Sequence, residues 1–131
     1  MTRVKERLKF NKMDNKEFSK QLEDRTKKFA ISVIRLSASL PNSYESNVIK
    51  NQITKSGTSV GANYREANRS RSKADFRNKI KICEAEASET VYWLEIINDL
   101  GWNKSEKNQL ILSETSELLA IFTSIGKNLK L

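Results

Sequence analysis

Apolar side chains recur every three or four residues through most of the chain, and this spacing places them on one face of an α-helix. The pattern is clearest between positions 73 and 101, where steps of four and three alternate. This seam consists of Phe76, Ile80, Cys83, Ala87, Thr90, Leu94, Ile97 and Gly101. It predicts a long amphipathic helix that starts after Ser72, ends at Gly101 and buries Cys83 as an inert thiol.

Two other segments have the same period. The first should begin near Asn15, after the capping-box spacing of Asp14 and Glu17, and stop at Pro41. Its stripe contains Phe18, Leu22, Phe29, Val33, Leu36 and Leu40, widened by Ala30 and Ile34. The second should begin after Ser105 and continue to the C-terminus. Its stripe contains Ile111, Thr115, Leu118, Phe122, Ile125 and Leu129.

Residues 44–67 are open to two interpretations. A seam of Ile49, Ile53, Ser56, Val60, Asn63 and Ala67 favours a helix. Gly57 and Gly61 would suit a loop equally well, because two interior glycines cost a helix about 1–2 kcal/mol relative to alanine. A helix here must recover that free energy through close packing on the face that both glycines share. The neighbour on that face is either another helix of the same chain or a second subunit.

Four amphipathic helices joined by short links predict an all-α fold, an antiparallel up-down-up-down four-helix bundle. We expect a single domain over residues 1–131, with residues 1–13 as a loose N-terminal arm because they lack a clear period. No apolar run approaches the roughly 18 residues of a membrane span, and we see no secretory signal. The one cysteine cannot form an intrachain disulfide, so the expected location is the cytoplasm.

The net charge of +8 is distributed unevenly. Residues 65–81 carry seven Lys and Arg against two Asp and Glu, whereas residues 82–101 carry five acidic residues and no basic one. A basic segment beside an acidic one suggests pairing between copies of the chain. The remaining positive excess favours polyanions as partners.

The basic segment is the candidate nucleic-acid site. Its residues are Arg65, Arg69, Arg71, Lys73, Arg77 and Lys81. An antiparallel hairpin would gather them at one end of the bundle, where phosphates relieve their mutual repulsion without reading sequence. Only Tyr64 and Phe76 are aromatic nearby, which argues against recognition of single strands by base stacking. The alternative is a solvated basic face, partly neutralised by Glu66, Asp75, Glu84 and Glu86.

The residues give little support to catalysis. Glu86 and Glu89 are three apart and could hold a metal ion, but di-metal bundles use Glu-x-x-His and this chain has no histidine. We therefore predict no catalytic residue, metal, cofactor or small-molecule substrate. Both glutamates are expected to pair with Arg65 or Arg69, within the subunit or across an interface. Trp93 lies off the main seam, so its helix is apolar on two sides, which favours self-association unless the N-terminal arm covers it.

Several of these residues also follow a family pattern, S-x-G-x-N-x-x-E, then R-S-x-x-D-F, then paired glutamates. The matching residues are Ser59, Gly61, Asn63, Glu66, Arg71, Ser72, Asp75, Phe76, Glu86 and Glu89. In them the chain resembles the four-helix bundle proteins encoded in intervening sequences of bacterial 23S ribosomal RNA genes, although Ala67 stands where that family often has glycine. The resemblance implies a homopentameric four-helix bundle with no established activity. A related bundle is a nucleic-acid-binding accessory of diversity-generating retroelements.

The function expected from these observations is that of a non-catalytic homo-oligomer that binds RNA or DNA without sequence preference. The alternative is a structural scaffold that binds a protein partner through its basic face and no nucleic acid.

Overall fold

The computed structural model describes residues 15–129, and the predicted N-terminal arm, residues 1–13, lies outside them. The described residues form four α-helices and no strand. The helices are α2 (Asn15–Ala38), α3 (Tyr44–Ala67), α4 (Lys73–Asp99) and α5 (Glu106–Lys127). The all-α prediction is therefore confirmed over this range. None of these helices is long and apolar enough to cross a membrane.

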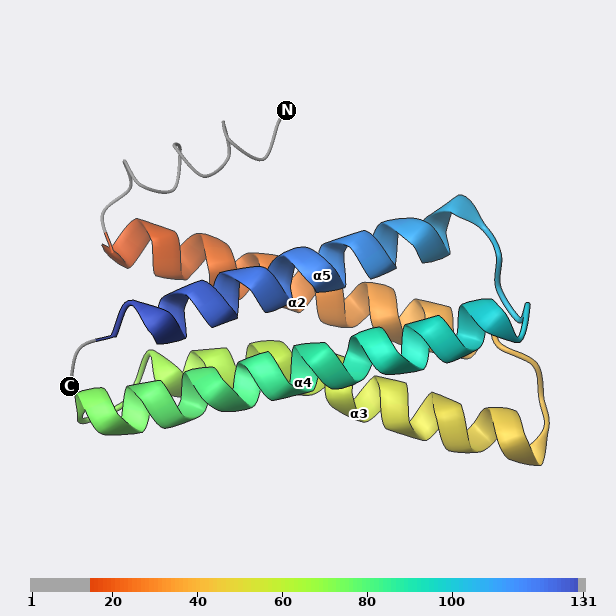
Figure 1. Ribbon diagram of the computed structural model, residues 1–131, viewed down its shortest axis with the longest axis horizontal. Helices are drawn as coiled ribbons and strands as arrows, with labels where there is room; N and C mark the ends of the chain where they lie inside the picture. The colour runs from red at the N-terminus through yellow and green to blue at the C-terminus, as the bar shows by residue number, and fades with distance from the viewer. Residues whose placement is uncertain (1–14, 130–131) are drawn as a thin grey trace.

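Each helix packs against its neighbours in the sequence, and α5 also contacts α2. Figure 1 shows the links 39–43 and 100–105 at one end of the molecule and the link 68–72 at the other. The second end also holds the start of α2 and the end of α5 (Figure 1). The fold thus brings three distant parts of the sequence to one place, hereafter the basic end.

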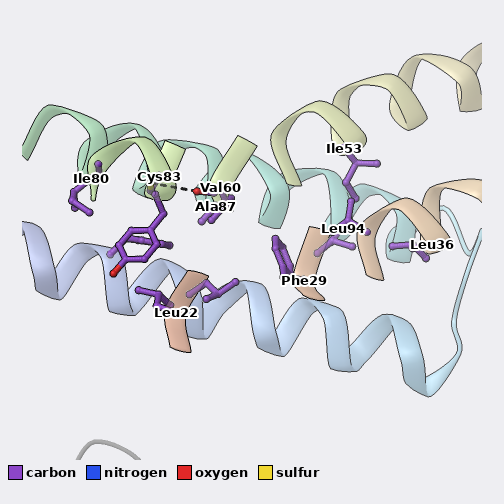
Figure 2. Packing of buried hydrophobic residues seen from close by; sticks show 14 of the residues in the cluster. Leu22, Phe29, Leu36, Ile53, Val60, Ile80, Cys83, Ala87 and Leu94 are labelled. Atoms are coloured by element: carbon purple, nitrogen blue, oxygen red, sulfur yellow. Dashed lines mark hydrogen bonds between the residues drawn. The ribbon is translucent and has the colours of Figure 1, made fainter. Parts of the chain in front are cut away.

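The core follows the predicted seams closely (Figure 2). On α4, the fully buried residues are Ile80, Cys83, Ala87, Thr90, Leu94 and Ile97. The expectation for Ile34 is wrong, because its side chain is 46% exposed and does not widen the buried stripe of α2. The gap in that stripe between Leu22 and Phe29 is instead filled by Thr26, which is fully buried. Asn63 is only half-buried, while its neighbour Tyr64 lies in the core.

Residues 44–67 form one continuous helix, so the loop interpretation is wrong. Gly57 and Gly61 are both buried, and α2 of the same chain lies on their shared face. A Cβ atom at Gly57 would lie 2.7 Å from Cγ1 of Val33, and one at Gly61 would lie 2.9 Å from Oγ1 of Thr26. The two backbones therefore approach more closely than a side chain at either position allows. This contact supplies the packing that offsets the low helix propensity of glycine.

Side chains fix where the helices begin and end. The hydroxyls of Ser43, Ser72 and Ser105 accept hydrogen bonds from backbone N–H groups three residues on, at 3.0, 3.1 and 3.4 Å. At the end of α4, Gly101 has φ of +71°, a conformation that glycine adopts without steric cost. These caps fix the helix ends and keep the links between helices short.

Candidate nucleic-acid interface

The six candidate cations come from the link 68–72 and from the helix turns beside it, and Figure 1 shows this link at the basic end. Arg65 comes from the last turn of α3, and Arg69 and Arg71 lie in the link. Lys73, Arg77 and Lys81 come from the first turns of α4. The site forms because Asn68 ends α3, donating its backbone N–H to the Tyr64 carbonyl at 3.1 Å, and Ser72 starts α4 four residues later.

Two basic side chains of this segment are already neutralised within the chain. Nε of Arg65 lies 3.6 Å from Oε1 of Glu23 on α2, so the expected pairing of Arg65 with Glu86 or Glu89 is wrong within the described subunit. Nζ of Lys79 donates to Oε2 of Glu66 at 2.8 Å, and this hydrogen bond raises the pKa of the lysine. Neither side chain is as available to a phosphate as an unpaired cation.

The other five cations have no such partner. Over residues 15–129 no ion pair engages Arg69, Arg71, Lys73, Arg77 or Lys81. Four of them are exposed, whereas Arg77 is half-buried and its Nε is covered without an acceptor in the described part of the chain. The four exposed cations, which have no ion-pair partner in the described part of the chain, are available to an incoming anion.

The fold adds three lysines that the sequence reasoning did not assign to this site. Lys16 and Lys20 belong to the first turns of α2, and Lys127 is the last residue of α5. Both helix ends lie at the basic end (Figure 1). The signal was present, since the predicted up-down-up-down order of helices places the start of the first helix, the second link and the end of the last helix together.

The two aromatic residues of this region belong to the core. Tyr64 is 1% exposed and its ring meets Phe122 edge to face, with centroids 5.5 Å apart. Burial, foremost, raises the pKa of the Tyr64 hydroxyl. Phe76 is half-buried against the same core cluster. Neither ring stands on the surface as a platform for a base.

Glu86, Glu89 and Trp93 lie on the flank of α4 next to α3. Burial raises the pKa of Glu86, the charge of Glu89 raises it further, and Lys55 of α3 lowers it. Oε2 of Glu86 and Nε1 of Trp93 are covered and have no hydrogen-bond partner among the described residues. In residues 15–129 no group of three or more His, Cys, Asp or Glu side chains is arranged to hold a metal ion.

A groove of about 620 Å³ separates α2 from α5. Its apolar lining consists of Phe18, Leu22, Phe29, Leu110, Ile111 and Ile121. Arg25 bridges the two helices, donating to Glu114 at 2.8 and 2.6 Å and to Glu117 at 2.7 Å. The bond to Glu114 is the main cause of the raised pKa of Arg25. These carboxylates are committed to the arginine, so they are poorly suited to act as acid or base on a bound molecule.

Comparison with known proteins agrees with this architecture. A family model described as 23S rRNA-intervening sequence protein matches residues 19–124. The chain belongs to this family. A family resemblance was predicted from the Ser59–Glu89 pattern, and it is confirmed.

This family member is also similar to a solved structure. That structure, determined at 1.70 Å, is of a protein of unknown function from the S23 ribosomal protein family of Bacteroides thetaiotaomicron VPI-5482. The two chains are 38% identical, with a TM-score of 0.75, and the match covers 81% of this chain and 98% of the other. No curated protein matches the chain.

Proposed function

We propose that this protein is a non-catalytic, cytoplasmic four-helix bundle that binds the sugar-phosphate backbone of RNA or DNA at its basic end. Its helices would run up, down, up and down, which the positions of the three links in Figure 1 support. The observation that carries the proposal is the set of five cations around link 68–72 that have no partner in residues 15–129.

Physical chemistry favours a phosphate ligand for this set. Unpaired cations close together repel one another, and a polyanion removes that repulsion while it releases its condensed counterions. Arginine side chains are suited to phosphate because their N–H groups can donate two parallel hydrogen bonds. With Tyr64 and Phe76 packed in the core, binding would depend on charge and shape, not on base identity.

Two other interpretations predict a different response. The cations of a solvated basic face would remain in water, partly neutralised by nearby acids as Arg65 and Lys79 are, and would bind no nucleic acid. A scaffold that binds a protein partner would show no affinity for nucleic acid. Both are tested by a direct binding measurement.

The expected result is tight, sequence-independent binding that depends on the basic end. Fluorescence anisotropy with two unrelated labelled duplexes, each as RNA and as DNA, at about 50 mM salt should give similar affinities for both sequences. Replacing Arg69 and Lys73 by glutamate should weaken binding on the order of 100-fold, since each reversal removes an attraction and adds a repulsion.

The matched control reverses the same number of positive charges at the opposite end of the molecule. Lys104→Glu with Lys107→Glu alters exposed residues in and next to the link 100–105 and should change affinity by less than about threefold. Equal losses in both double variants would indicate nonspecific attraction to net charge. No binding by the wild type would contradict the proposal.

We also propose that the protein self-associates, as a homopentamer according to the family resemblance. Apolar side chains on the surface of the described chain support association, among them Ile31, Ile34, Ile82 and Tyr92, which are 39, 46, 40 and 56% exposed.

A further inference from the structure

A second stripe runs along α4 beside the buried seam. It consists of Ile82, Glu86, Glu89, Trp93 and Ile96, at steps of four, three, four and three. The stripe lies on the flank nearest α3, since Lys79 of that flank pairs with Glu66 of α3 and Lys55 of α3 acts on Glu86. It is acidic and apolar, and it includes the covered Glu86 oxygen that has no partner in the described chain.

Helix α2 carries a complementary stripe on its outer surface. It consists of Lys20, Lys27, Ile31 and Ile34, at steps of seven, four and three. This stripe also leans toward α3. Glu23 and Ser37 both bond side chains of α3, and Lys27 lies four residues after Glu23 while Ile34 lies three before Ser37. All four stripe residues are exposed, so α2 presents a basic and apolar surface.

The halves of the two stripes that are nearer the basic end lie at the same height along the bundle axis. Gly61 contacts Thr26 of α2, and the adjacent Val60 accepts a hydrogen bond from Cys83 of α4 at 3.4 Å. Thr26 and Cys83 are therefore level. Lys27 follows Thr26 by one residue and Glu86 follows Cys83 by three, so they differ in height by about 3 Å at 1.5 Å per residue.

The same difference in height between the two stripes recurs farther from the basic end. Gly57 contacts Val33 of α2, and the adjacent Ser56 accepts a hydrogen bond from Thr90 of α4 at 2.8 Å. Both α2 and α4 start at the basic end, so they run in the same direction (Figure 1). Ile34 follows Val33 by one residue and Trp93 follows Thr90 by three, which again gives a difference of about 3 Å.

We propose that the α4 stripe of one copy docks on the α2 stripe of the next copy, with Glu86 against Lys27 and Trp93 against Ile31 and Ile34. This inference rests on the proposed self-association and names its surfaces. Opposite charges meet, and apolar side chains that a single copy leaves on its surface become covered. The Glu86 oxygen gains a cation from outside its own chain.

The geometry also predicts the type of assembly. Two different surfaces of one chain form a heterologous, head-to-tail interface, which gives a ring or a filament. Because the stripes are level, each copy is added with little rise along the bundle axis. Because both stripes flank α3 and are not back to back, each copy is also rotated relative to the last. Rotation with little rise favours a closed ring over an open filament.

Charge reversal tests the pairing by light scattering. The wild type should have a mass several times that of the 15.1 kDa chain. The variants Glu86→Lys and Lys27→Glu should each fall toward the single-chain mass. Combining both changes in one chain should restore the assembly, because this pair then meets with its charges exchanged. Glu95→Lys/Asp99→Lys, which changes α4 outside the stripe, should leave the mass unchanged.

Crosslinking provides a second test, which stays informative if the charge-reversal variants are less stable than the wild type. Ile31→Cys and Glu89→Cys alter exposed positions, and the native Cys83 is fully buried and should not react. A short bismaleimide should crosslink a mixture of the two variants into dimers, while neither variant alone should crosslink.

The outcomes separate the two levels of the proposal. An assembly that resists the charge reversals and gives no mixed crosslink would overturn these surfaces but leave self-association standing. A wild-type mass of 15.1 kDa at micromolar concentration would overturn both. Neither result would bear on nucleic-acid binding at the basic end.

Discussion

Replacing Gly57 by leucine should lower the free energy of unfolding by about 3 kcal/mol or more. The new Cβ atom would lie 2.7 and 2.9 Å from the two methyl carbons of Val33, and the rest of the side chain would have to displace α2. Val33 is fully buried and β-branched, so it has little freedom to turn aside. The higher helix propensity of leucine returns only about 1 kcal/mol. Urea denaturation followed by circular dichroism measures the change.

The control places the same side chain on the exposed side of the same helix. Ala62→Leu should change the free energy of unfolding by no more than about 0.5 kcal/mol. Adding Val33→Ala to Gly57→Leu should recover part of the loss, because it removes the methyl groups that the leucine meets. A Gly57→Leu protein as stable as the Ala62→Leu protein would contradict the close approach of α2 and α3.

Alkaline pH should destabilise the protein through Cys83 by about 4 kcal/mol. Burial raises the pKa of this thiol from 9.0 to about 12, and its sulfur donates to the Val60 carbonyl at 3.4 Å (Figure 2). Above pH 9 the unfolded thiol has lost its proton while the folded one keeps it. The unfolded state then binds fewer protons, so the free energy of unfolding falls by about 1.4 kcal/mol per pH unit until pH 12.

Comparison with Cys83→Ala isolates this effect, since every other titratable side chain is the same in both proteins. The difference in the free energy of unfolding between wild type and variant should be constant below pH 8.5 and should shift against the wild type as pH rises to 12. Parallel pH profiles for the two proteins would show that the thiol is not buried as described.

The seam of α4 could be predicted from sequence because a long regular period leaves one choice of buried face. Residues 80–97 of that seam are buried as expected. The helix 44–67 could not be decided in the same way. Glycine lowers local helix propensity, and the contact that offsets it, Val33 against Gly57, joins positions 24 residues apart in the sequence.

The candidate site shows the same limit. The clustering of cations around link 68–72 follows from the helix order alone, so sequence sufficed to place them together. The partner of Arg65 did not follow, because the period of a helix gives the face of a residue but not the neighbour on that face. Arg65 proved to face Glu23 of α2, and Tyr64, one residue earlier, proved to lie in the core.

The salt dependence of duplex DNA binding tests most directly whether the basic end engages phosphates. About five phosphate contacts predict that log K falls against log salt with a slope near −4, and Lys73→Gln with Arg77→Gln should reduce the steepness of that slope by about 2. A slope near zero, or the same slope in wild type and variant, would contradict phosphate binding by these residues.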